Sequence, residues 1–461
     1  MQSSPGALFF IPNIPQFIAF RVFFNARFYY PVFTILFLDF GLTIEQFALL
    51  NTVWAATIVL AEVPSGALAD IVGRKRLLVA TSLLMMVELL LICFVPLGNM
   101  TLVFWIFFLN RILSGLAEAM ASGADEALAY DTLAERGQAD DWPKVLDLQM
   151  RMQSAGFVIT MTLGALVYDP DTVNQVLQWM GAQTAVTQQT TMRYPLYLTL
   201  LLSFFALIAT LSMRDPQVNM SEPYRDAPLF QIISKSFKLT WQVGRWIVMT
   251  PFALAVILFG MTCDHSLRMI VTMESQYLRL INYPEASFGL IGSGLGMLGL
   301  LVPRIARSMT ERYTPARNLL ILSMITLAGL WGLVGFFPYY GLLPMVLVFV
   351  GMMLTSFFTS HYLNKITGSE QRATVLSFKG LSFNLAYGMI GILYAGLITH
   401  LRGKNQMVNG AWSQQAIENQ AFRDSISWFP WYTVVMLSVL FFFFWRYREH
   451  QIFTADWDDN K

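Results

Sequence analysis

The sequence predicts an all-α integral membrane protein with twelve transmembrane helices. Of its 461 residues, 56% are hydrophobic and only 13% are charged, about half the charge of a typical soluble domain. Because one crossing needs about 20 mostly apolar residues, twelve crossings fit the chain and leave room for loops. We expect spans at approximately 16–38, 46–69, 77–96, 101–123, 152–168, 194–212, 247–272, 286–306, 317–337, 341–363, 375–399 and 426–445.

The distribution of Lys and Arg along the chain predicts its orientation. Cations accumulate on the cytoplasmic side of membrane proteins. With both termini cytoplasmic, most of the 30 Lys and Arg fall in cytoplasmic segments, Lys379 included, and the outer loops hold only Arg193, Arg279, Arg402, Lys404 and Arg423. We therefore expect an even number of spans and two cytoplasmic termini.

The cysteines and histidines indicate no metal centre. Cys93 and Cys263 both lie in apolar segments, where we expect packing residues rather than a disulfide framework or thiolate ligands. The four histidines are scattered along the chain without the spacing of a metal site. We therefore expect neither a metal nor a cofactor.

A charged stretch divides the chain into two predicted halves. Residues 214–245 form the longest charged, proline-containing segment between spans. We expect an N-terminal six-helix bundle at 1–213, a cytoplasmic linker at 214–245, and a C-terminal six-helix bundle with a short tail at 246–461. In the later part of the linker, from Leu229 to Val243, apolar residues alternate with lysines, which predicts an amphipathic helix on the membrane surface.

The segment after the second span carries the most informative motif. Its pattern is Gly66-x-x-x-Asp70-x-x-Gly73-Arg74-Lys75-Arg76. We expect Gly66 to permit the close approach of a neighbouring helix, and the three cations belong in the cytoplasm. The pattern resembles the loop between the second and third helices of the major facilitator superfamily; a basic stop after an apolar helix is the alternative.

The resemblance implies that this motif gates the protein. We expect Asp70 to meet the first turn of span eleven, near Thr374 to Phe378, where the helix dipole favours an anion. Arg74 would pair with Asp131, an acid after span four. Arg372 begins a segment before span eleven that resembles one in a bacterial branch of the superfamily, and we include it in the gating set.

Charged residues within the predicted spans are expected to pair or to face a wet cavity, since each costs about 3 kcal/mol near a helix centre. Arg21 lies near the cytoplasmic end of its span, where we expect its side chain to snorkel. The membrane-embedded charges of the N-terminal half are Arg21, Arg27, Arg111, Glu62, Glu88 and Glu118.

Span four is expected to carry proton coupling. Spacings of three and four residues place five of its residues on one helical stripe, namely Arg111, Gly115, Glu118, Ser122 and Asp125. The pattern Arg111-x-x-x-Gly115 also resembles the fourth-helix motif of proton-coupled members of the superfamily. We assign Arg111, Glu118 and Asp125 to coupling, with a structural ion pair between helices as the alternative.

The first spans of the two halves supply the substrate-binding candidates. Arg27 and Tyr30 stand beside Pro31, which bends the first helix; an aromatic, cationic bend suits an anionic or zwitterionic solute. In the second half, Asp264 and Arg268 are four residues apart and can pair, with His265 adjacent. We assign Arg27, Tyr30, Arg111, His265 and Arg268 to binding and Asp264 to coupling; for His265 the alternative is an ordinary satisfied polar residue.

The resemblance implies a secondary transporter of a bacterial inner membrane that works by alternating access, with its site near mid-membrane between the two halves. We expect a small polar, zwitterionic or anionic solute, a proton as coupling ion, the lipid bilayer as surroundings, no nucleic acid and a monomer. The alternatives are a drug or siderophore-type efflux antiporter and a non-transporting receptor. An enzyme is not expected, because no converging nucleophile and base or metal-ligand set is present.

Overall fold

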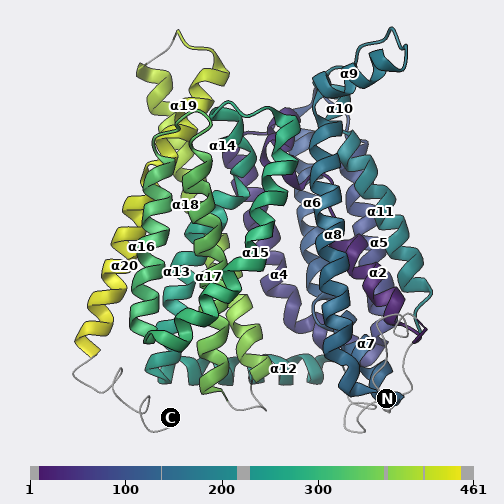
Figure 1. Ribbon diagram of the computed structural model, residues 1–461, viewed down its shortest axis with the longest axis vertical. Helices are drawn as coiled ribbons and strands as arrows, with labels where there is room; N and C mark the ends of the chain where they lie inside the picture. Colours follow the sequence, from purple (N-terminus) through teal and green to yellow (C-terminus); the bar gives the residue numbers. More distant parts are fainter. Residues whose placement is uncertain (1–9, 137, 215–228, 368–371, 409–410, 448–461) are drawn as a thin grey trace. The chain divides into compact units, whose positions relative to one another are not determined.

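The computed structural model describes residues 10–136, 138–214, 229–367, 372–408 and 411–447, and these residues form helices joined by turns (Figure 1). Contacts divide the chain into two compact units. Unit 1 contains Met1–Phe237 and Pro284–Ser293, and unit 2 contains Lys238–Tyr283 and Gly294–Lys461. The expected limits of bundle, linker and bundle at residues 213 and 245 stay a prediction.

Eleven helical stretches of the described residues are long and apolar enough to cross a membrane. They correspond to the second to twelfth predicted spans. The first predicted span differs, because it is divided into α2 (Ile14–Asn25), a short 3-10 helix η1 (Tyr30–Val32) and α3 (Phe33–Asp39). Pro31 explains part of the difference: in a continuous helix its ring would clash with the carbonyl of Arg27.

The interruption at residues 26–29 is held by its neighbours in unit 1. Backbone polar groups inside a membrane need partners, and the N–H of Phe28 donates to the hydroxyl of Thr199 at 3.1 Å. On another side, a Cβ at Gly164 would lie 1.8 Å from the carbonyl oxygen of Phe28. The missing side chain therefore allows the interruption to approach the helix of Gly164, and this fixes the place of Arg27.

Side-chain caps begin two of the remaining spans of unit 1. Thr43 begins the second span with a capping box in which the N–H of Gln46 donates to the Thr43 hydroxyl and the Gln46 side chain accepts from the Thr43 N–H, and Asn99 caps the fourth. The helices are α4 (Ile44–Val72), α5 (Arg74–Cys93), α6 (Met100–Ala121), α7 (Ala124–Glu135), η2 (Ala139–Asp141), α8 (Trp142–Tyr168), α9 (Pro170–Trp179), α10 (Gln188–Thr191) and α11 (Tyr194–Leu211), with η4 (Glu285–Ser287) from the later segment.

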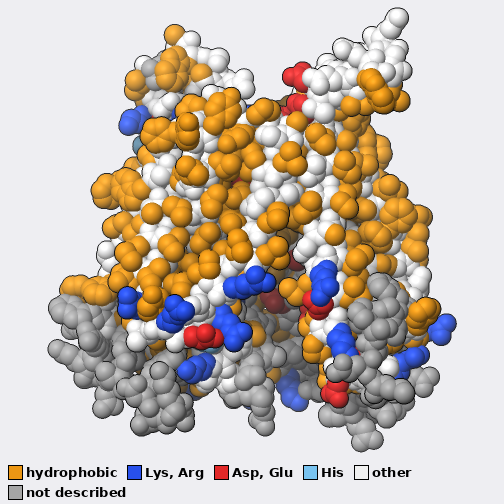
Figure 2. All heavy atoms as spheres, in the orientation of Figure 1, with side chains coloured by type: hydrophobic (Ala, Val, Ile, Leu, Met, Phe, Trp, Pro, Cys, Tyr) orange, Lys and Arg blue, Asp and Glu red, His pale blue; other side chains and the backbone are white. Residues whose placement is uncertain are grey.

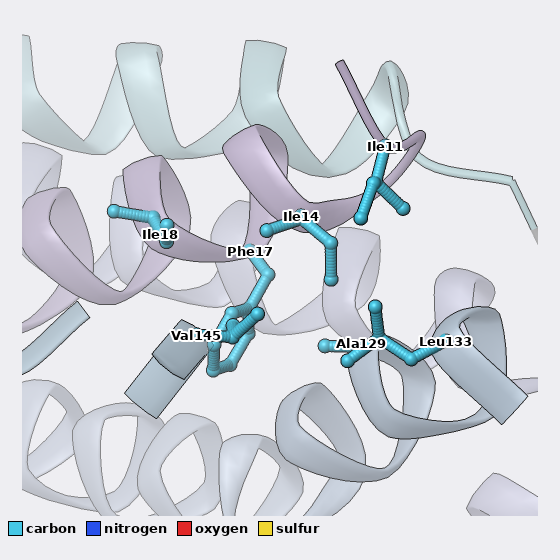
Figure 3. Packing of buried hydrophobic residues seen from close by; sticks show 7 residues of the cluster. All are labelled: Ile11, Ile14, Phe17, Ile18, Ala129, Leu133 and Val145. Atoms are coloured by element: carbon cyan, nitrogen blue, oxygen red, sulfur yellow. The ribbon is translucent and has the colours of Figure 1, made fainter. Parts of the chain in front are cut away.

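Apolar side chains hold the beginning of α2 against α7 and α8 (Figure 3). Ile14 and Phe17 of α2 have no exposed surface, and neither do Leu133 of α7 and Val145 of α8. Full burial of such a side chain contributes about 1.5–3 kcal/mol each. This cluster fixes one end of α2, and with it the approach to residues 26–29.

The polar stripe predicted along span four is wrong beyond Ala121. Gly123 has a φ of 77°, so α6 ends before it and α7 begins after it. Ser122 and Asp125 therefore do not continue the helical face of Arg111 and Gly115. On α6 itself Arg111 and Gly115 are buried, whereas Glu118 is exposed.

Unit 2 has the same all-helical character. Its helices are α13 (Pro251–Thr272), α14 (Glu274–Leu280), α15 (Phe288–Arg312, whose first turns belong to unit 1), α16 (Pro315–Leu333), α17 (Leu342–Ile366), α18 (Arg372–Val408), α19 (Gln414–Ile426) and α20 (Trp428–Tyr447). The helix α18 extends beyond the predicted span 375–399 at both ends. Lys379, expected among the cytoplasmic cations, lies inside the membrane-spanning stretch Thr374–Val408.

The predicted amphipathic helix of the linker is present as α12 (Leu229–Met249). Its exposed side includes Phe237 and Trp241, the latter 77% exposed. Apolar residues exposed on one side of a helix with lysines on the other suit the surface of a bilayer.

Candidate functional site

A buried charged network occupies the middle of unit 1. Nη1 of Arg27, beside the interruption after α2, lies 2.9 Å from Oε1 of Glu88 on α5. The amide of Asn110 on α6 donates to the other carboxylate oxygen, Oε2, at 3.1 Å. Glu88 has no exposed surface, and Arg27 and Asn110 are also buried. Two helices and the interruption between α2 and η1 thus meet at one carboxylate, and both of its oxygens are satisfied away from water.

Arg111 extends this network toward the aromatic residues after the interruption. Its Nε and Nη2 donate to Oδ1 of Asn110 at 3.1 and 3.0 Å, so Asn110 joins Glu88 to Arg111. The guanidinium carbon also lies 5.4 Å from the ring centres of Phe33 and Phe37. Cation–π contacts of this kind stabilise a desolvated guanidinium.

Two other candidates of unit 1 keep exposed surface. Tyr30 is 45% exposed, unlike its neighbour Tyr29, and Glu118 is exposed on α6. The Glu118 carboxylate has no hydrogen bond or ion pair with the residues that the structure describes, although it interacts electrostatically with Arg27 and Arg21.

Asp125 is placed apart from Arg111, near the end of unit 1 where α7 begins. Its Oδ2 lies 2.6 Å from Nε of Arg21, which also pairs with Glu126. Arg21, expected to snorkel into the headgroup region, instead uses its charge to join α2 to α7. The burial of Asp125 beside this arginine indicates an ion pair that fastens two helices.

The motif after α4 is only partly described. Gly73, with a φ of 95°, separates α4 from α5, and Arg74 of α5 pairs with Asp131 of α7. This is the pair that we expect from the sequence; its role in gating stays a prediction, as do those of Lys75 and Arg76. The close approach expected at Gly66 is wrong for this structure, because a Cβ there would meet no described atom within 4 Å.

Two members of the predicted gating set cannot be placed. The side chains of Asp70 and Arg372 lie outside the residues that the structure describes, although both backbones are helical. The expected contact of Asp70 with the first turn of span eleven stays a prediction.

Unit 2 contains a second charged network, centred on α13. Nη2 of Arg268 lies 2.6 Å from Oδ2 of Asp264, one helical turn earlier. Nη1 of the same guanidinium donates to Oδ1 of Asn384 on α18 at 2.9 Å. Its carbon lies 5.4 Å from the ring centre of Tyr387. The side chain of Arg268 keeps 27% of its surface exposed, so this cation is more accessible than Arg27 or Arg111.

A lysine of α18 adds another positive charge to this region. Nζ of Lys379 donates to the hydroxyl of Ser360 on α17 at 2.8 Å and lies 5.6 Å from the ring centre of Phe383. Lys379 also interacts electrostatically with Asp264 and Arg268. Unit 2 therefore holds two cations around one carboxylate.

His265 is turned toward a different helix. Its Nε2 lies 2.9 Å from the hydroxyl of Tyr432 on α20, and Nδ1 contacts the carbonyl of Met261. Both ring nitrogens thus have partners within unit 2, and the residue is buried. This geometry favours the ordinary alternative, a satisfied polar residue between α13 and α20.

Sequence reasoning missed three members of these networks. Asn110 and Asn384 are amides inside apolar spans, one beside Arg111 and the other on the helix that faces Arg268. Lys379 was placed among the cytoplasmic cations. The available signal was its position four residues inside the predicted span 375–399, at a depth where a lysine needs a partner.

One acid beyond the end of α13 is buried without a charged partner. Glu274 begins α14, outside the membrane-spanning helices, and its Oε1 is buried with no hydrogen-bond partner among the described residues. Burial raises the pKa of this carboxyl to about 8. No group of three or more His, Cys, Asp or Glu suited to a metal ion occurs among the residues described.

Comparison with known proteins assigns the fold to a family. The sequence pattern described as Major Facilitator Superfamily matches residues 16–360, whereas no curated protein matches the chain.

Solved transporters share the arrangement of the helices at low sequence identity. A mutant of the nucleoside transporter NupG is 12% identical, with a TM-score of 0.70 and coverage of 94% of this chain and 99% of that chain. A bacterial homologue of the human lysosomal transporter Spinster, inward-facing and unoccupied, is 13% identical, with a TM-score of 0.68 and coverage of 95% and 97%. A D-xylose–proton symporter is 11% identical, with a TM-score of 0.62 and coverage of 93% and 97%. Because the family pattern covers well over half of the chain, this multi-pass membrane protein belongs to the Major Facilitator Superfamily and is a secondary transporter rather than an enzyme.

Proposed function

We propose that the protein moves a small polar solute with an anionic or zwitterionic group across the membrane by alternating access. Unit 1 is balanced, because Glu88 and Glu118 both interact electrostatically with Arg27 and offset the charges of Arg27 and Arg111. One observation carries the proposal: the charged network of unit 2 has more cations than carboxylates, with Arg268 and Lys379 around Asp264. In a medium of low dielectric constant such an excess attracts an anionic group and repels a cation.

The two networks contribute in different ways. Arg27 and Arg111 are buried against their own partners, so we assign them to the framework of the site in unit 1 rather than to direct solute contacts. Arg268 is accessible, and its planar guanidinium suits a carboxylate or phosphate. The exposed Tyr30 adds an aromatic surface with a hydroxyl that can donate or accept a hydrogen bond. We assign direct solute contacts to Arg268 and Tyr30.

The coupling ion in this proposal is a proton, and its acceptor is Glu118. Glu118 makes no ion pair with the described residues but interacts electrostatically with Arg27 and Arg21, and a carboxylate in such a place can gain and lose a proton as these cations move nearer or farther away. Asp125 is the weaker candidate, because Arg21 already compensates its charge. The similarity to a D-xylose–proton symporter supports a proton as coupling ion.

We further propose a bacterial inner membrane with both termini in the cytoplasm. The beginning of α5, which carries Arg74, Lys75 and Arg76, would face the cytoplasm under the positive-inside rule. We keep a monomer as the working unit, since each charged network lies within one unit of one chain.

A ligand screen followed by uptake measurements tests the proposal. The purified full chain would be heated with uridine, D-xylose, glutamate or tetraphenylphosphonium, and its thermal unfolding would be recorded. We expect stabilisation by a polar, anionic or zwitterionic compound, and proton-driven uptake of that compound into proteoliposomes. Stabilisation by the lipophilic cation alone would favour the efflux alternative.

A further inference from the structure

A groove on unit 2 lies at the end of α15 that precedes α16. It has a volume of about 340 Å³ and belongs entirely to the last three turns of α15 and the residue after them. Its lining consists of Arg304, Ile305, Ser308, Met309, Arg312 and Tyr313. Arg304, Ser308 and Arg312 follow one another at intervals of four, which places them on one side of the helix.

The donors of this groove are unused within the described protein. The side chains of Arg304, Ser308 and Arg312 have no hydrogen bond or ion pair with any residue that the structure describes. Arg307, on the adjacent side of α15, differs because its Nε lies 2.8 Å from Oε1 of Glu311. Two guanidinium groups and a hydroxyl therefore line one concave surface without a protein acceptor.

An apolar stripe leads into the groove from the middle of the span. Met297, Leu301 and Ile305 are four residues apart, and each is more than half exposed. On the face shown in Figure 2, hydrophobic side chains predominate in the upper and middle parts of the view. Lys and Arg side chains gather in the lower part. A cationic surface thus continues into an apolar surface.

We propose that this groove binds the phosphate of an anionic phospholipid. The phosphate oxygens would accept hydrogen bonds from Arg304 and Arg312 in the forked geometry that guanidinium groups provide, and the Ser308 hydroxyl would donate a third. One acyl chain would lie along Met297, Leu301 and Ile305. A lipid is favoured over free phosphate because the apolar stripe adjoins the cationic groove, and basic pockets at the cytoplasmic side of transmembrane helices bind anionic headgroups in general.

Native mass spectrometry of the purified full chain tests this site. Phosphatidylglycerol would be titrated in detergent, and dioleoylglycerol, which lacks the phosphate, would be titrated in parallel. Arg304→Gln and Arg312→Gln each remove one charge from the groove. Arg307→Gln removes one charge from the adjacent side of the same helix and is the matched control. Thermal unfolding of each variant would verify that it is folded, as expected for exposed residues.

We expect Arg304→Gln and Arg312→Gln each to weaken phosphatidylglycerol binding about tenfold, the effect of one lost charge-assisted contact, and Arg307→Gln to leave it unchanged. Equal losses in all three variants, or in none, would overturn the assignment. Equal binding of dioleoylglycerol would also overturn it. Displacement of the lipid by inorganic phosphate or glycerol phosphate at the same concentration would show a free-phosphate site and reject the lipid.

Discussion

Arg27 and Glu88 are 61 positions apart in the chain, yet Nη1 of the first lies 2.9 Å from Oε1 of the second inside unit 1. The pair depends on two local features. The interruption of the first span places Arg27, and the amide of Asn110 donates a hydrogen bond to Glu88 while it accepts one from Arg111. Substitutions can separate the contribution of this pair to stability from its contribution to transport.

Glu88→Leu should destabilise the protein by about 3–5 kcal/mol, because it leaves a buried guanidinium without its carboxylate. The double variant Arg27→Met, Glu88→Leu should recover much of that loss, since no unpaired charge remains. Both variants should lose transport if this ion pair is needed for the transport cycle. Thermal unfolding and uptake would be measured on the same preparations; full transport by a stable double variant would show a purely structural pair.

Glu118→Gln should abolish accumulation of solute driven by a pH gradient while sparing exchange of solute for solute, because the amide cannot carry the proton. Asp125→Asn is the comparison: it breaks the ion pair with Arg21 and should lower stability more than coupling. Uptake into proteoliposomes with and without a pH gradient distinguishes the two. Unchanged accumulation by Glu118→Gln would place the proton acceptor elsewhere.

Lys379→Met should weaken solute binding without large effects on folding, because its single described hydrogen bond is to the Ser360 hydroxyl. Ser360→Ala removes the same hydrogen bond and keeps the charge, and should therefore bind solute like the unmodified protein. Equilibrium binding to both variants checks the prediction. If both substitutions weaken binding equally, the role of Lys379 is to position α17 rather than to supply charge.

Glu274 should make stability depend on pH. Burial raises the pKa of this carboxyl in the folded protein from 4.5 to about 8, so the folded state retains a proton that the unfolded state has released. The contribution of Glu274 to the free energy of unfolding is therefore fully present below pH 4.5. It declines as pH rises toward 8, by about 1.4 kcal/mol per pKa unit at most.

Glu274→Gln should remove this decline and raise the unfolding temperature at pH 8 more than at pH 5. Asp171→Asn, which changes an exposed carboxyl of α9, serves as control and should leave the pH profile as it is. Identical pH profiles for Glu274→Gln and the unmodified protein would show that Glu274 is ionised and solvated.

The fold was predictable to a large extent, because hydropathy, the placement of Lys and Arg and the motif from Gly66 to Arg76 all act locally in the sequence. Among the described residues, eleven spans correspond to stretches that length and hydropathy predict. Pro31 indicated the interruption near Arg27. The end of α6 at Ala121 lies close to the end of the predicted span 101–123, but the polar stripe was extended too far, since the left-handed backbone at Gly123 breaks a pattern that spacing alone extends to Asp125.

The candidate site was predictable only in part, because its partners come from distant segments. The pair of Asp264 and Arg268 follows from helical periodicity. The links from Glu88 to Asn110 and from Arg268 to Asn384 depend on which helices pack together, and spacing along one helix carries no information on that. Lys379 was misplaced because it was counted with the cytoplasmic cations although it lies inside the predicted span 375–399.

The most direct test of the account is the affinity of the purified protein for the solute found in the ligand screen, with and without Arg268. Arg268→Gln removes the accessible cation and should weaken binding of an anionic or zwitterionic solute more than tenfold, since a charge-assisted hydrogen bond contributes about 1.5–3 kcal/mol. The control is Arg193→Gln. Arg193 donates a hydrogen bond to the carbonyl of Val95 in unit 1, and this variant should bind the solute normally. Tight binding of a lipophilic cation, unaffected by Arg268→Gln, would contradict the account.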